Sequence, residues 1–333
     1  MNRELIVMPE DGPQPLLDPI LNAKESLRIK MFVFSAPEFI TAVIEAKKRG
    51  VKVRVMLNPA RRSGESDNEE TRKTLLEGGV EVIDSNPHFD MTHEKSMVVD
   101  DRLAVVQSLN WETKNLTKTR DYAIITTHKH EVQEVADCFD ADWERKHFAM
   151  NENGHMIWCK GNARERIAHL IDNARETLWL QNERYQDQVI IERIVRAAVR
   201  GVKVHIMARP PHTLKLDKMI EGVGGMRLMN DVGCHVHRLT EHRLHGKLLV
   251  ADGERAILGS INLSPGSFDS RRELAIETRD EHILKRLTAL MHHDWKHSEA
   301  LDLSDEALIA EMKKHDKGEA VDALVLNGNG KKH

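Results

Sequence analysis

Short apolar runs alternate with longer amphipathic stretches along most of this chain. Compact runs of Val, Ile and Leu are typical of buried strands, whereas apolar residues spaced three or four apart are typical of helices packed on a sheet. In the first half this pattern predicts helices at 16–26, 37–49, 70–77 and 131–145, and strands at 27–34, 51–57 and 80–83, with a polar loop at 61–70. Alternating helices and strands predict an α/β fold with a mostly parallel or mixed sheet.

The second half repeats this order. AKESLRI at 23–29 matches ARETLWL at 174–180, and RGVKVRVM at 49–56 matches RGVKVHIM at 200–207, each pair 151 residues apart. Asp142-Trp143 returns as Asp294-Trp295, 152 residues later. The pattern predicts helices at 164–175, 188–200, 214–221 and 281–297, and strands at 177–181, 202–208 and 234–238. A tandem duplication with pseudo-two-fold packing is the simplest explanation.

These repeats predict three regions along the chain. The first lobe covers residues 1–150 and the second covers 151–300, with the polar, glycine-marked segment 151–154 at the boundary. Residues 301–333 form the third region, in which we expect one short helix at 305–314 and a frayed tail at 327–333.

One segment occurs in each half and carries most of the candidate chemistry: HEKSMVVDDRLAVVQSLN at 93–110 and HGKLLVADGERAILGSIN at 245–262. The alternation around His-x-Lys predicts a buried strand with both side chains on one side. An apolar run follows, and then an acidic turn leads into a second strand that returns Ser and Asn towards the His. The turns are Asp100-Asp101 and Asp252-Gly253, and the second strands are 103–106 and 255–258.

The side chains gathered by such a hairpin suit a phosphate group. Lys95 and Lys247 would hold the non-bridging oxygens and stabilise the charge of the transition state. Hydroxyl and amide groups would add hydrogen bonds, from Ser108, Asn110, Ser260 and Asn262. His93 and His245 would supply a neutral nucleophile and a protonated acid, because imidazole takes either state near neutral pH.

The two segments resemble the signature of the phospholipase D superfamily, H-x-K-x4-D followed by G-S-x-N, and specifically its bacterial cardiolipin synthase-like members. The second copy matches in full, and the first has Gln107 in place of the Gly. The resemblance implies tandem α/β/α sandwich lobes with mixed sheets and an active site between them. It also implies phosphodiesterase or phosphatidyltransferase chemistry without a metal, through a phosphohistidine intermediate, with His93 as nucleophile and His245 as acid.

Acidic residues have two different roles in this reading. Asp121 in TRDYAI and Glu273 in RRELAI, 152 residues apart, are the candidates for orienting the two imidazoles, as members of this family use an acid here. The signature groups Asp100 and Asp252 with the catalytic His and Lys residues. Their turn positions nevertheless favour a structural role, because Asp stabilises turns locally.

Composition limits the partners and the compartment. The net charge of −4 excludes a global polycation that binds nucleic acid indiscriminately, and 40% hydrophobic residues exclude a disordered chain. The lack of a signal layout, the lack of an 18-residue apolar run, and three scattered cysteines predict a cytoplasmic protein with buried thiols. The 19 histidines include close groups such as His292, His293 and His297, but no Cys or carboxylate pattern completes a zinc set. We therefore expect no metal and no cofactor.

Three functions remain open from the sequence. Phospholipid headgroup transfer or hydrolysis comes first, with peripheral contact at the inner membrane. A nuclease is the alternative, because basic clusters at 61–62, 114–120 and 271–272 and the aromatic residues Trp111 and Phe268 could contact nucleic acid. A catalytically silent phosphate-binding protein is the third. The headgroup, the acceptor and the oligomeric state stay open, although two motifs in one chain make a monomer sufficient for the site.

Overall fold

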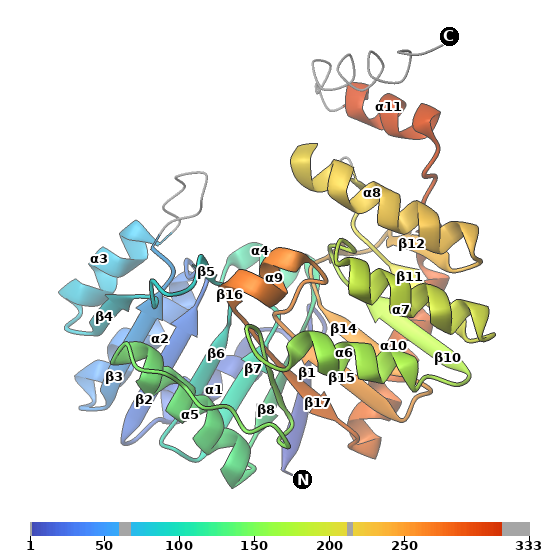
Figure 1. The fold of residues 1–333 in the computed structure, drawn as a ribbon. Coiled ribbons are helices and arrows are strands. Elements are labelled where there is room, and N and C mark those ends of the chain that lie inside the picture. The colour runs from blue at the N-terminus through green and yellow to red at the C-terminus, as the bar shows by residue number, and fades with distance from the viewer. Residues whose placement is uncertain (1, 60–67, 212–215, 315–333) are drawn as a thin grey trace.

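A computed structural model describes residues 2–59, 68–211 and 216–314, and it shows two mixed β-sheets side by side, each covered by helices (Figure 1). The first sheet has the order β1 (Arg3–Met8), β8 (Thr119–Thr126), β7 (Leu103–Gln107), β6 (Ser96–Val99), β2 (Ser26–Met31), β3 (Lys52–Leu57), β4 (Glu81–Asp84). The second has the order β18 (Ser298–Ala300), β12 (His235–Leu239), β11 (Lys203–Met207), β10 (Thr177–Gln181), β14 (Leu248–Ala251), β15 (Arg255–Gly259), β17 (Leu274–Thr278), β9 (Met156–Trp158).

The two sheets are copies of one design. Ser96 pairs with Val106 between β6 and β7, and Leu248 pairs with Leu258 between β14 and β15, with both partners shifted by 152 residues. In the first sheet β2 runs parallel to β3 on one side and antiparallel to β6 on the other. In the second sheet β10 runs parallel to β11 and antiparallel to β14 in the same way. These matched registers confirm the predicted tandem duplication of an α/β lobe.

Helices cover both faces of each sheet. The outer core of the first lobe forms under α1 and α2, and that of the second under α6 and α7. A third core contains residues of α5 and α10 together with the inner faces of both sheets, so the two lobes share buried apolar surface. The helices are α1 (Gln14–Asn22), α2 (Pro37–Lys48), α3 (Glu69–Glu77), α4 (Thr113–Thr117), α5 (Lys129–Trp143), α6 (Ala163–Asp172), α7 (Gln188–Val199), α8 (Leu216–Asp231), α9 (Pro265–Ser270), α10 (Glu281–Lys296) and α11 (Asp305–Lys314).

Two short parallel pairings cross between the lobes. β5 (Met91–Thr92) pairs with β16 (Arg271–Arg272), and β13 (Arg243–Leu244) pairs with β8 at Thr119–Arg120. On one strand each pairing lies directly before a motif histidine, and on the other it lies directly before Asp121 or Glu273, the acids at equivalent positions of the two repeats. The backbone of each lobe therefore brings a histidine to the carboxylate of the other lobe.

Several predicted elements need correction. The His-x-Lys segments are not strands, because β6 begins at Ser96 and β14 at Leu248, after the lysines. The helix predicted at 16–26 ends at Asn22, because the backbone N–H groups that follow bind Asp100. The helix predicted at 214–221 extends to Asp231. Arg61, Arg62 and most of the loop predicted at 61–70 lie outside the described residues, as does the tail at 327–333.

The edge strand β1 was missed by the pattern. Its register runs antiparallel to β8 from Arg3 opposite Thr126 to Met8 opposite Asp121. The side chain of Arg3 reaches Glu131 of α5 and Asp280 before α10, so this strand also joins the two lobes. Only the last four of its six residues, LIVM, are apolar, and so short a run gives too little periodicity to identify such a strand.

Both hairpin turns are held by an Asp side chain that accepts backbone hydrogen bonds. Asp100, Asp101, Asp252 and Gly253 have positive φ angles between 53° and 67°, the left-handed conformation of a tight hairpin turn. The Asp100 carboxylate accepts the backbone N–H groups of residues 24–26, and the Asp252 carboxylate accepts those of residues 175–177. These bonds hold the start of each central strand against the turn, which supports the structural role and separates both acids from the catalytic groups.

We expect Asp252→Ala to lower the free energy of unfolding by about 1–2 kcal/mol, the usual cost of removing a side-chain cap from several backbone N–H groups. Urea unfolding followed by circular dichroism measures the change. Glu254→Ala, which removes an exposed carboxylate from the same turn, is the matched control. Equal losses in the two variants would contradict the role given to Asp252.

Candidate active site

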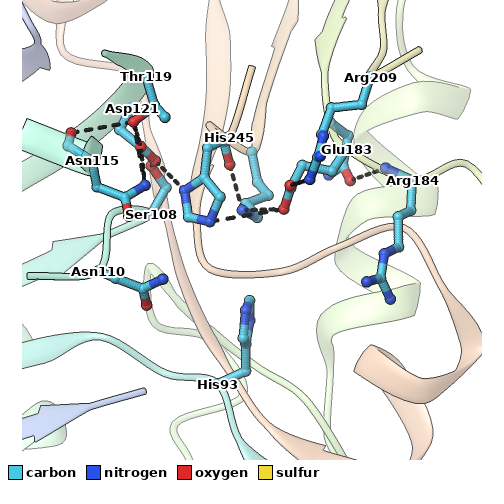
Figure 2. A network of polar contacts seen from close by, with 12 residues as sticks. His93, Ser108, Asn110, Asn115, Thr119, Asp121, Glu183, Arg184, Arg209 and His245 are labelled. Carbon is cyan, nitrogen blue, oxygen red and sulfur yellow. Dashed lines mark hydrogen bonds and ion pairs between the residues drawn. The ribbon is translucent and has the colours of Figure 1, made fainter. Parts of the chain in front are cut away.

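Each motif histidine is held by a carboxylate from the other lobe. His93 Nδ1 lies 2.9 Å from Glu273 Oε2, and His245 Nδ1 lies 2.8 Å from Asp121 Oδ1 (Figure 2 shows the second pair). Both acids carry low pKa values, so they accept, and Nδ1 of each ring donates. The sequence identified these two acids as orienting residues, and the structure adds that each acts across the lobes.

The carboxylates are themselves fixed. Asp121 is fully buried and accepts hydrogen bonds from Ser108 Oγ at 2.6 Å, Thr119 Oγ1 at 2.5 Å and Asn115 Nδ2 at 3.1 Å. Burial alone would raise the pKa of Asp121, but His245 and Lys247 hold this pKa below its ordinary value. Burial likewise opposes ionisation of Glu273, yet His93 brings its pKa to about 2. Both acids therefore stay charged and keep the rings in one orientation.

Two buried lysines stand beside the rings. Lys95 Nζ donates to the backbone oxygen of His93 at 2.6 Å, and Lys247 Nζ donates to that of His245. The pKa of Lys95 lies well below its ordinary value, first because of burial and second because of the charge of Lys247. Together with the crossed contacts His93–Glu273 and His245–Asp121, this indicates that the two motifs form one site. Figure 2 shows the side chains of His93 and His245 converging on the same region.

The two histidines have different neighbours at equivalent positions. The His93 ring packs edge-on against Phe32 with ring centroids 4.8 Å apart. Position 183 of the second lobe corresponds to position 32 of the first. Two residues earlier, Lys30 pairs with Ser96 at the start of β6, and Gln181 pairs with Leu248 at the start of β14. There Glu183 lies 3.9 Å from His245 Nε2 and 3.0 Å from Lys247 Nζ, and it is paired with Arg209 (Figure 2). One ring thus has an aromatic neighbour and the other a carboxylate.

The surroundings of His93 lower the pKa of its ring. Burial is the largest effect that lowers its pKa, Lys95 lowers it further, and Glu273 only partly offsets them, so the pKa falls to about 3. The ring is therefore neutral at physiological pH, with its proton on Nδ1 and a lone pair on Nε2. A neutral ring with a free Nε2 is the form in which imidazole acts as a nucleophile.

The two Ser residues have hydrogen-bond partners inside the lobes. Ser108 and Ser260 are fully buried, and their hydroxyls bond within the sheets: Ser108 to Asp121 and Tyr122, and Ser260 to both the carbonyl and the N–H of Leu274. These bonds position the hairpins, and contact of the hydroxyls with a phosphate stays a prediction.

The Asn residues remain candidates for contact with a substrate. Asn110 and Asn262 each leave a buried amide oxygen without a hydrogen-bond partner. A buried amide oxygen without a hydrogen bond destabilises a closed core. It is expected where a ligand or a water molecule donates the missing hydrogen bond. A rotation of the amide about its last torsion presents N–H instead of oxygen, so either residue can donate to a phosphate.

Sequence reasoning missed Phe32, Glu183 and Arg184. Arg184 follows Glu183, and its side chain extends towards the region between the histidines (Figure 2). The alignment of the repeats holds a signal for Glu183, because a charged residue after β10 replaces the Phe after β2. Arg184 adds a basic group to the two motif lysines, with Arg209 and Arg271 nearby, and basic side chains of this kind suit a phosphodiester anion.

A buried ion pair accompanies each of the two short strand pairings between the lobes. Arg272 Nη2 donates to Asp142 Oδ1 at 2.9 Å, and Arg120 donates to both oxygens of Asp294 at 3.0 and 2.8 Å. Each arginine comes from a crossing strand, and each aspartate comes from the closing helix of the other lobe. The repeated Asp-Trp pair of the sequence therefore anchors the crossings.

Two groups of side chains among the described residues have metal-ligand spacing. Glu94, Cys138 and Asp142 form the first, and the buried ammonium of Lys30 already occupies it, 2.9 Å from Glu94 and 2.8 Å from Asp142. Glu241, His293 and His297 form the second, at the end of α10, with all three side chains exposed. Neither includes a motif histidine.

Comparison with known proteins agrees with this geometry. The family described as "Cardiolipin synthase, PLD-like domain" matches the chain twice, over residues 16–143 and 167–295. The chain belongs to the phospholipase D superfamily. Cardiolipin synthase B of Salmonella typhimurium is 24% identical over 324 residues, covering 81% of this chain and 75% of that protein. Human mitochondrial cardiolipin hydrolase is 31% identical over 137 residues, covering 41% of this chain and 52% of that protein.

Solved structures share the fold. Phosphatidylserine synthase of Haemophilus influenzae superposes with a TM-score of 0.71 at 12% identity, covering 90% of this chain and 87% of that one. Polyphosphate kinase of Porphyromonas gingivalis also gives 0.71, at 17% identity, covering 96% of this chain and 53% of that one. At these identities the likeness concerns the arrangement of the two lobes.

We expect the ring of His93 to stay neutral at pH 5, where an ordinary exposed imidazole, with a pKa of about 6.5, is mostly protonated. Nitrogen NMR of labelled protein, assigned with His93→Gln, reads the protonation state directly. Because the unfolded chain binds this proton below about pH 6.5 and the folded chain does not, His93 makes the protein less stable as the pH falls from 6.5 towards 3. Protonation of His93 between pH 6 and 7 would contradict the prediction.

Proposed function

We propose that this protein is a phosphatidyltransferase or phospholipase that breaks the headgroup phosphodiester of a phospholipid without a metal ion. The observation that carries the proposal is the pair of crossed carboxylate–histidine contacts, which engage Nδ1 of each ring and leave Nε2 for the reaction, beside two buried lysines. Among the described residues, only His245 has an acid near Nε2, because Glu183 lies 3.9 Å from it. The name of a relative in sequence, cardiolipin synthase B, supports a lipid substrate.

The proposed reaction has two steps. In the first, His93 Nε2 attacks phosphorus, an N–P bond forms, and the P–O bond to the headgroup breaks while His245 gives its proton to the leaving oxygen. In the second, His245 takes a proton from water or an alcohol, whose oxygen bonds to phosphorus as the N–P bond breaks. His93 is then neutral again and His245 is protonated, as at the start.

The remaining residues assist these steps. Lys95 and Lys247 would bind the non-bridging oxygens as negative charge builds up, a role in which preorganised cations in a buried site are most effective. Because the lysines supply this charge, the steps require no metal ion. Glu273 and Asp121 would hold the rings and stabilise their positive charge after proton or phosphoryl transfer.

Asymmetry between the lobes supports the assignment of roles. Burial and Lys95 favour the neutral form of His93, which has the aromatic Phe32 as its neighbour, whereas His245 has the carboxylate of Glu183 3.9 Å from Nε2, where it can stabilise positive charge. The described residues include no helix that is both long and apolar enough to cross a bilayer, so we propose that the site meets lipid at the membrane surface.

We expect the purified protein, with EDTA present, to release or exchange headgroups from phosphatidylglycerol liposomes. His245→Ala should slow this reaction by about 10²–10⁴-fold, the usual contribution of a general acid, and His93→Ala should abolish it. Label from a phospholipid with a radioactive phosphate should become bound to the protein as an acid-labile adduct, and His93→Ala should prevent this labelling.

His147→Ala, an exposed histidine outside the site, is the matched control and should leave turnover and labelling unchanged. Parallel assays with single- and double-stranded DNA and with polyphosphate separate the possible substrates. Cleavage of DNA or polyphosphate alone would replace the lipid assignment. Full lipid activity in both motif variants would overturn the proposed mechanism.

We expect Glu183→Gln to move the high-pH side of the activity profile to lower pH by about one unit, because an opposite charge at about 4–6 Å favours the protonated acid by at least that much. The low-pH side, which belongs to another group, should stay in place. Glu176→Gln, an exposed change of the same kind at the opposite end of β10, serves as the control. A uniform loss of activity at every pH would instead mean that Glu183 only supports the structure.

A further inference from the structure

Three exposed side chains meet where α10 ends. His293 Nε2 lies 3.5 Å from Glu241 Oε2, and His297 Nε2 lies 3.9 Å from Glu241 Oε1. The ligand atoms of all three residues lie within 4.8 Å of one another. His293 and His297 are one helical turn apart, so their rings stand on one face of the helix, with centroids 4.3 Å apart.

These atoms have the spacing that a shared metal ion requires. Zinc bonds of about 2.0–2.2 Å at tetrahedral angles separate neighbouring ligand atoms by about 3.4 Å. The observed contacts of 3.5 and 3.9 Å are close to this value and long for direct hydrogen bonds. The side chains are 42–52% exposed, so ion pairs here would add little stability.

Local hydrogen bonds prepare His297 as a ligand. Its Nδ1 lies 2.9 Å from the backbone oxygen of His293, which can only accept, so Nδ1 is the donor and Nε2 is the nitrogen left to bind a metal ion. A second bond of this kind to a carbonyl is the usual partner of a metal-bound imidazole. Thr240 donates from both its backbone N–H and its hydroxyl to the His297 oxygen, which fixes the segment that carries Glu241.

We propose that Glu241, His293 and His297 form a surface site for a divalent transition metal ion, with Zn²⁺ as the best fit. Two neutral imidazoles and one carboxylate are ligands of intermediate softness, which suit zinc better than magnesium or calcium. Water would complete the coordination. The site is separate from the reaction at His93 and His245 and does not depend on it.

The site would link two parts of the second lobe. Glu241 lies in the connection from β12 to β13 and is followed four residues later by His245. The two histidines lie on α10, whose Asp294 anchors Arg120 of the crossing strand. A bound ion would therefore restrain the segment that enters the active site.

Isothermal titration of the full chain with ZnCl₂ at pH 7.5 tests the proposal. We expect one saturable site, with the affinity reduced by at least about tenfold in both Glu241→Gln and His297→Ala, since losing even an outer partner of a metal ligand costs about 10–100-fold. His292→Ala, an exposed neighbour on the same helix outside the trio, should bind as the unaltered protein does.

A spectroscopic measurement keeps the test independent of folding defects. Cobalt bound to this ligand set should give visible absorption bands, which Zn²⁺ displaces and which Glu241→Gln, a change that preserves shape, weakens. Circular dichroism verifies that each variant is folded. No zinc binding, or zinc binding that Glu241→Gln and His297→Ala leave undiminished, would overturn the proposal.

Discussion

The crossed backbone pairings between the lobes are the constraint on which the rest of the site depends. His93 N and Glu94 N both donate to the carbonyl of Arg272, and His245 N and Gly246 N both donate to that of Arg120. Because the next residue on each accepting strand is the orienting acid, four backbone hydrogen bonds place both imidazoles against their carboxylates. The side-chain contacts of 2.9 and 2.8 Å follow from this register.

Buried charge secures these crossings at some cost to the stability of the fold. Removing ions such as Lys30, Arg120 and Arg272 from water is unfavourable, and only well-formed partners offset the penalty. Each has them: Lys30 lies between Glu94 and Asp142, Arg272 reaches Asp142, and Arg120 reaches Asp294. Loss of one partner would leave an unpaired buried charge, so the network favours a single arrangement of the two lobes.

The sequence predicted much of this arrangement because its information is local or repeated. The duplication, most helices and strands, the hairpin turns and the two orienting acids follow from periodicity and from the constant offset. The crossed partners of His93 and His245 could not be predicted, because they depend on strands of two residues that carry no periodic signal. The hydrogen bonds of Ser108 and Ser260 to β8 and β17 could not be predicted either, because the motif records the residue type but not its partners in the fold.

The equivalent positions 32 and 183 have a consequence for how such a protein can change. If two identical subunits supplied the lobes, the same residue would lie beside both histidine rings, and any substitution of it would change the surroundings of both. In a single fused chain, Phe32 and Glu183 are inherited separately, so one imidazole can keep an aromatic contact while the other acquires an acid. Fusion of the lobes thereby allows the two histidines to have different roles. It also makes each lobe depend on the other, since the carboxylate that orients each histidine belongs to the opposite lobe.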